Sequence, residues 1–212
     1  MYGLHALVSN SPASSSDLAQ LRRLAIQILC ARSQQIKKHA RGLFDLRELQ
    51  GPAARQLLLQ LLDHPDPAVQ EPAAYQLAWL HDLRAVEALF DVLQDRHRHP
   101  RVVGQAAEAI GVILTFKDRR TTVMRRSTAV LVGMLQDEHP TVRFWACYAL
   151  GTMRARSALP ALRRTARHDT ALCRGWWRVS EEAEDAITVI AGGKPPERER
   201  VGKEYPLAAD TR

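Results

Sequence analysis

Eight histidines are the residues in this sequence best suited to metal chemistry, because imidazole is the commonest metal ligand in proteins. Four of them, His64, His99, His139 and His168, lie in the short stretches that separate the apolar segments. If those segments are stacked helices, equivalent loops lie about 8 to 10 Å apart, whereas a metal needs ligands about 2.0 to 2.1 Å from its centre. We therefore predict no metal site and no cofactor.

Cysteine and tryptophan are the other side chains that invite a functional interpretation. The three cysteines, Cys30, Cys147 and Cys173, are far apart and odd in number, which indicates free thiols and a cytoplasmic protein. Trp145 stands in the aromatic run RFWACY. Trp176 and Trp177 form a pair that either seals the end of the fold or anchors a partner.

A repeat positions these side chains. The segments 66–80, 99–113 and 139–153 each begin with Pro-x-Val and continue with small and aliphatic residues at matching places. Their prolines, Pro67, Pro100 and Pro140, are 33 and 40 residues apart, a period typical of stacked helical repeats. After Val142, the apolar or small residues recur at helical spacing on one face. Asp66, His99 and His139 precede the prolines and are expected to cap the helices.

The fold class that follows is all-α. Each unit is a helix pair whose apolar faces only neighbouring units can cover. We predict a right-handed α-α superhelix of the HEAT or armadillo-like solenoid type, with about four to five helix pairs over residues 16–191. Residues 1–15 are expected to be a loose N-terminal segment, and residues 192–212 a flexible polar C-terminal tail that does not pack. No run of apolar residues is long enough for a membrane span.

The pattern PxVRxxAAxALGxxxxxxALPAL, seen between Pro140 and Leu162, resembles HEAT-like repeats, including those of the phycobilisome-lyase type. The resemblance implies several possible activities. Some HEAT-like enzymes hydroxylate a modified lysine with iron held by His-Glu dipeptides, but this sequence contains no such dipeptide. Others are alkylpurine DNA glycosylases, which work in a basic groove. A phycobilin-lyase-like, chromophore-handling protein is a further alternative.

The charge distribution favours binding over catalysis. The chain carries a formal net charge of +7, and residues 96–178 hold 16 basic against 5 acidic side chains. We predict that the protein is not an enzyme but a scaffold or adaptor that binds a protein partner, with nucleic acid as the alternative, through a concave face formed by the second helix of each pair. The oligomeric state is not predicted. The residues expected to contact the partner are Arg125, Arg126, Arg163, Arg164, Arg167, Trp145, Trp176 and Trp177.

Overall fold

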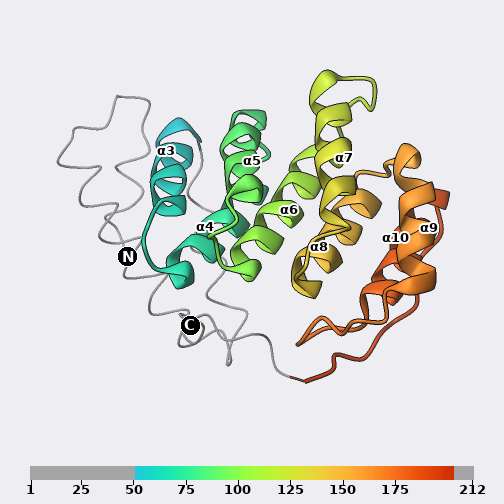
Figure 1. Ribbon diagram of the computed structural model, residues 1–212. Coiled ribbons are helices and arrows are strands. Elements are labelled where there is room, and N and C mark those ends of the chain that lie inside the picture. Colours follow the sequence, from blue (N-terminus) through green and yellow to red (C-terminus); the bar gives the residue numbers. More distant parts are fainter. Residues whose placement is uncertain (1–50, 203–212) are drawn as a thin grey trace.

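The computed structural model describes residues 51–202, and this part of the chain is a stack of α-helices (Figure 1). A lone antiparallel bridge joins Leu172 to Arg178, and the described residues contain no longer strand pairing. The all-α solenoid predicted from the repeat is therefore confirmed, whereas the N-terminal segment 1–15 lies outside the described residues. The helices are α3 (Gly51–Leu62), α4 (Pro67–Trp79), α5 (Val86–Gln94), α6 (Pro100–Leu114), α7 (Thr122–Met134), α8 (Pro140–Thr152), α9 (Leu159–His168) and α10 (Val179–Ala191), with short 3-10 turns at Leu83–Ala85 and Arg156–Ala158.

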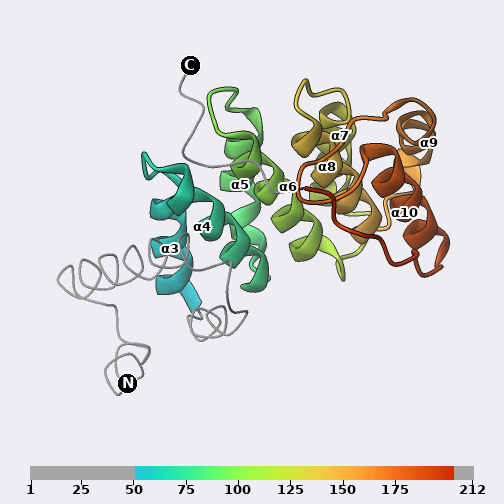
Figure 2. The same cartoon turned by 90° about the horizontal axis from the view of Figure 1, so that it is seen from below.

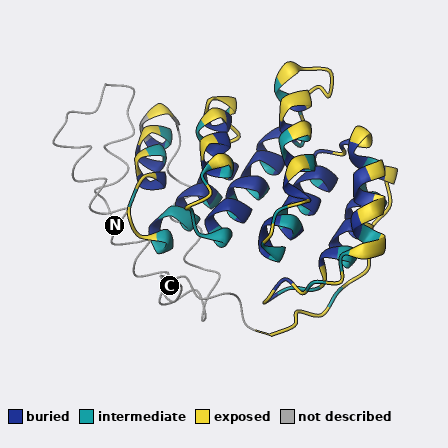
Figure 3. Cartoon of the chain, viewed as in Figure 1, coloured by how far each residue is buried: buried dark blue, intermediate teal, exposed yellow. Residues whose placement is uncertain are grey.

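The helices form two rows. In one row α4, α6, α8 and α10 pack directly against one another, and in the other α3, α5, α7 and α9 stand further apart (Figures 1 and 2). Burial follows this division, because the helices of the first row are largely buried and those of the second row each keep an exposed side (Figure 3). The closely packed row therefore consists of the three Pro-x-Val helices α4, α6 and α8 together with α10. The second helices, to which the concave face was assigned from the sequence, form the other row.

Small residues explain the close packing of the first row. A Cβ atom added to Gly111 of α6 would lie 2.8 Å from the Cα atom of Ala149 on α8. A Cβ atom added to Gly151 of α8 would lie 2.8 Å from the Cα atom of Ala186 on α10. Real Cβ atoms do not approach backbone so closely, so a larger residue at either position would force the neighbouring helix to shift.

The predicted caps are present at the starts of three first-row helices. The Asp66 carboxylate accepts a hydrogen bond from the Ala68 amide at 2.8 Å. Two histidines do the same with Nδ1, His99 toward the Arg101 amide and His139 toward the Thr141 amide, each at 3.2 Å. Burial lowers the pKa of His139, which favours the neutral ring that an Nδ1 acceptor requires. His99 and His139 thus act as the N-caps of α6 and α8.

Candidate functional site

A cavity of about 270 Å³ opens on the first row, between α4, α6, α8 and the loop that precedes α10. On each helix the lining residues are separated by helical turns, so that they share one face. Counted from the proline that starts each helix, they fall mainly at the second, sixth and ninth positions, which the packing of the stack leaves open. The lining residues are Glu71, Tyr75, Arg101, Gln105, Glu108, Thr141, Trp145, Cys173, Arg174 and Trp176.

Two carboxylates differ sharply in their surroundings within this cavity. Glu71 is held by the guanidinium of Arg101 in a two-pronged contact, with Nε–Oε1 and Nη2–Oε2 distances of 2.8 and 2.9 Å. Glu108 accepts a hydrogen bond from the Gln105 amide and forms no ion pair with any described residue. Burial raises the pKa of Glu108 to about 7, and the nearby charge of Glu71 adds to this rise while the Gln105 bond opposes it. A nearby positive charge would therefore stabilise the ionised form of Glu108.

Aromatic rings form the opposite wall. Trp145 of α8 meets Trp176 of the loop edge to face, with ring centroids 5.1 Å apart, and meets Tyr148 in the same way at 5.4 Å. Gly104 of α6 makes room for the indole, since a Cβ atom there would lie 2.5 Å from Cδ1 of Trp145. Electron-rich ring faces beside a carboxylate favour a cationic ligand.

A second aromatic layer supports this wall. Phe144 is 1% exposed and lies 5.5 Å from Trp177 between ring centroids. The Trp177 indole donates a hydrogen bond of 2.9 Å to Glu182 of α10. Burial raises the pKa of Glu182 to about 8, with Asp185 adding to the rise. The layer fixes the wall and also holds a second carboxyl group that titrates near neutrality.

The cysteines of the described chain offer no nucleophile. Cys147 and Cys173 are both buried, and neither forms a disulfide bond with another described residue. Burial raises the pKa of the Cys147 thiol, so the reactive thiolate is disfavoured. Cys147 is completely buried in α8, which suits a small packing residue.

The residues singled out from the sequence divide into two groups. Trp145 and Trp176 line the cavity, and Trp177 lies behind them, so the structure brings the tryptophans together. The arginines lie on the second row, on α7 and α9. They are exposed, and Arg126 pairs with Glu87 at 2.7 Å. Their role in contacting a partner stays a prediction, and it concerns Arg125, Arg126, Arg163, Arg164 and Arg167.

Sequence reasoning missed Glu71, Tyr75 and Glu108. They occupy columns that vary between repeats, and the packing pattern gave no reason to single them out. The signal was their spacing, because polar or aromatic residues at the same columns of successive first-row helices point to the same side of the stack.

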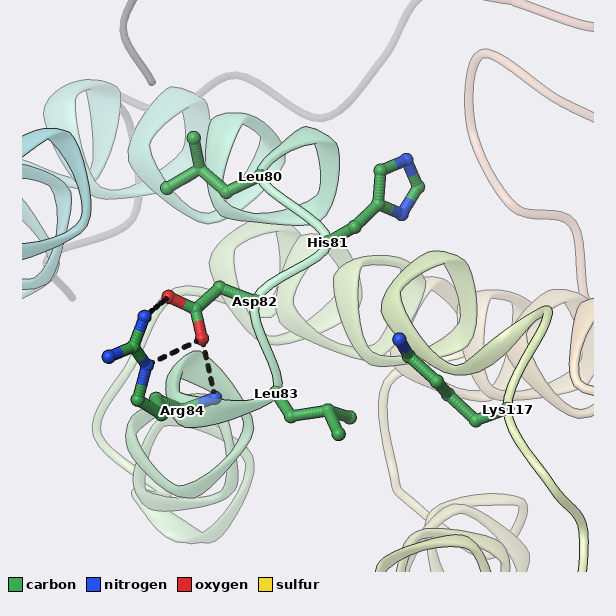
Figure 4. A pocket seen from close by; sticks show the side chains of 6 residues that line it. All are labelled: Leu80, His81, Asp82, Leu83, Arg84 and Lys117. Atoms are coloured by element: carbon green, nitrogen blue, oxygen red, sulfur yellow. Dashed lines mark hydrogen bonds and ion pairs between the residues drawn. The ribbon is translucent and has the colours of Figure 1, made fainter. Parts of the chain in front are cut away.

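A second, wider recess of about 510 Å³ lies at the turn after α4, beside the loop after α6. Figure 4 shows that Asp82 accepts hydrogen bonds from the guanidinium and the backbone amide of Arg84, at 2.9 to 3.0 Å. Asp82 also accepts one from Arg55. His81 and Lys117 line the other side, away from this pair. The only carboxylate of this recess is thus already neutralised, so we assign the functional site to the first cavity.

The described residues do not fit an iron centre. No group of three or more His, Cys, Asp or Glu side chains within residues 51–202 could hold a metal ion. The same part of the chain contains no helix long and apolar enough to cross a membrane.

The model of HEAT repeats matches residues 13–111 and 96–179. The chain belongs to the HEAT-repeat family. Among characterised proteins, this HEAT-repeat chain is 36% identical over 103 residues to deoxyhypusine hydroxylase of Arabidopsis thaliana, a match that covers 49% of the chain and 33% of the relative. It is 38% identical over 87 residues to the human deoxyhypusine hydroxylase, covering 41% of the chain and 29% of the relative. The chain thus spans about a third of the length of the relatives that it matches.

A likeness to solved structures supports the fold alone. An engineered protein is 22% identical with a TM-score of 0.52, and the match covers 85% of this chain and 76% of that one.

These relatives correct the function predicted from the sequence. They carry the name of an enzyme, which contradicts a non-catalytic scaffold, an absence of enzymatic function and the emphasis on phycobilin lyases. The prediction failed because it took the missing His-Glu dipeptides as evidence against this kinship.

Proposed function

We propose that this HEAT-repeat protein binds a protonated amine on a lysine-derived side chain of a protein partner, and so serves a deoxyhypusine hydroxylase-like modification. The name of the relatives supplies the substrate class, since deoxyhypusine is a modified lysine. The observation that carries the proposal is Glu108, a half-buried carboxylate without an ion-pair partner in the described chain, in a cavity that is also lined by aromatic rings.

An ammonium group suits this cavity for two physical reasons. It would supply the counter-charge that burial makes favourable for Glu108. It would also lie near the ring faces of Trp145 or Trp176, where a desolvated cation gains about 2 kcal/mol. Glu71 keeps its own partner, Arg101, so that one carboxylate stays available for the ligand.

No oxidative step is assigned to the described residues, because they do not fit the iron that the resemblance implies. The role we propose for them is to bind and orient the amine. The buried cysteines are in keeping with the reducing, cytoplasmic setting that we also propose.

Calorimetric titration with 1,4-diaminobutane and with a lysine-containing peptide tests the proposal. The matched control ligand is the same peptide with an acetylated lysine, which keeps the length and removes the charge. The wild-type protein should bind the amines and not the acetylated peptide, and Glu108→Gln should weaken amine binding about tenfold or more. Glu138→Gln, an exposed site, should leave the affinity unchanged. Equal binding of the charged and acetylated peptides would refute amine recognition.

A further inference from the structure

The chain beyond α10 does not leave the fold. Residues 198–201, which we call the C-terminal strap, run back beside the loop that precedes α10 (Figures 1 and 2). The Val201 amide donates a hydrogen bond to the Trp176 carbonyl at 2.7 Å, and the Gly175 amide donates to the Val201 carbonyl at 3.0 Å. The prediction that residues 192–212 do not pack is therefore wrong for this strap.

Two arginines of the strap make its side-chain contacts. Arg198 holds both oxygens of Asp185, with Nε–Oδ2 and Nη2–Oδ1 distances of 2.7 and 2.8 Å, and it also donates to the Glu181 carbonyl at 3.1 Å. Asp185 is 6% exposed, so this contact neutralises a buried charge. Arg200 places its guanidinium carbon 3.9 Å from the centre of the Trp176 ring. The strap thus contacts two parts of the fold. Arg198 binds α10, and Arg200 and Val201 hold Trp176.

Trp176 is the residue on which these contacts converge. Its backbone pairs with Val201, its ring lies against Arg200, and the same ring meets Trp145 across the cavity wall. The loop lies outside any helix, and within it the Leu172–Arg178 bridge and the hydrogen bond from the Cys173 amide to the Trp177 carbonyl hold its backbone. Gly175 has φ 87°, a left-handed conformation that disfavours any other residue.

We propose that the C-terminal strap positions Trp176 as a wall of the amine cavity, with Arg198 and Arg200 as positioning residues. The inference rests on the proposed amine binding and assigns a part of the affinity to residues that do not line the cavity. The acidic side chains of α10 provide the anchor for Arg198, and Arg200 holds the ring from the side of the strap. Loss of either contact releases Trp176 and lowers the affinity of the cavity for the amine.

Arg200→Gln and Arg198→Gln in the full chain test the strap, with Arg200→Lys as the conservative variant and Arg96→Gln, at an exposed side chain, as the control. We expect 1,4-diaminobutane to bind Arg200→Gln about three- to fivefold more weakly than wild type, a loss that Arg200→Lys partly restores. Tryptophan emission should shift to longer wavelength in both Gln variants, and amide exchange at Val201 should accelerate in Arg198→Gln. Because Arg198→Gln leaves Asp185 unpaired and can lower stability, Arg200→Gln, at an exposed side chain, is the decisive variant.

The outcomes separate the strap from the amine site. If wild type and Arg200→Gln bind the diamine equally, the strap does not position the wall, and amine binding itself stands. If wild type and Arg96→Gln bind no amine, the proposed function is wrong, and the role of the strap in an amine cavity is wrong with it. An unchanged emission spectrum in Arg200→Gln would also overturn the strap.

Discussion

The pH dependence of amine binding follows from Glu108. Its pKa of about 7 means that roughly a tenth of the carboxyl groups are ionised at pH 6 and roughly nine tenths at pH 8. A lysine-type amine, with a pKa of about 10.4, stays protonated throughout this range. If the ammonium binds only the ionised carboxylate, its affinity should rise about tenfold from pH 6 to pH 8.

The groups around Glu108 allow this slope to be assigned. Glu71 is paired with Arg101, and the Gln105 amide does not titrate. Glu182, whose pKa is about 8, lies behind Trp177 and not in the cavity lining. The pH dependence should therefore disappear in Glu108→Gln and persist in Glu182→Gln.

Calorimetric titration of 1,4-diaminobutane at pH 6, 7 and 8, in two buffers of different ionisation enthalpy, measures both the affinity and the number of protons released on binding. Binding near pH 7 should release a fraction of a proton from wild type and none from Glu108→Gln. A flat affinity in wild type, or a tenfold slope that survives in Glu108→Gln, would refute the assignment of the cavity's charge to Glu108.

Three other predictions concern packing and buried charge. Gly151→Ala should lower the free energy of unfolding by about 1 to 3 kcal/mol in urea denaturation, because the new Cβ meets the backbone of α10, whereas Gly133→Ala, with open space around it, should be neutral or stabilising. Gly104→Ala should displace the Trp145 indole, change its fluorescence and lower the affinity for the amine. An unaltered emission spectrum would contradict the close contact between Gly104 and Trp145. Folding raises the pKa of Glu182 from 4.5 to about 8, so the folded state holds this proton more tightly and the free energy of unfolding should fall as pH rises between these values. Glu182→Gln should remove that part of the slope, and an identical slope in the variant would count against it.

The sequence predicted the packing of the stack well because packing repeats. Val69, Val102 and Val142 are all buried, and the Pro-x-Val start appears in each helix. A position that recurs in three helices can be recognised from the sequence without a structure. The capping role of His99 and His139 was predictable for the same reason.

The cavity could not be predicted in the same way because its columns do not repeat. Gln105 and Trp145 occupy equivalent columns, as do Tyr75 and Glu108, yet the members of each pair differ in size, charge and polarity. Only the two-row geometry shows that these unlike residues face one space. The partner-binding face predicted from the sequence lies on the second helices, and its arginines are not among the residues that line the cavity.

The strap was missed for a different physical reason. Residues 192–212, which include the strap, form a polar segment with three prolines and few apolar residues, and on composition alone this segment is predicted not to pack. The signal lay instead in α10, where Asp185 falls on the buried face beside Ala186. A carboxylate buried on that face requires a cation, and Arg198 is the side chain that supplies it.

The separation of packing columns from cavity columns has a consequence for how this family diversifies. Residues such as Gly111 and Gly151 hold neighbouring helices at a fixed approach, and their neighbours within the seam cannot change without moving a backbone. The cavity positions project from the same helices into open space, so Glu108 or Trp145 can change with little effect on the stack. A chain can therefore keep the packing of the HEAT stack while its cavity takes up different chemistry. This is why kinship alone does not provide the metal ligands, and why the function has to be argued from Glu108 and its neighbours.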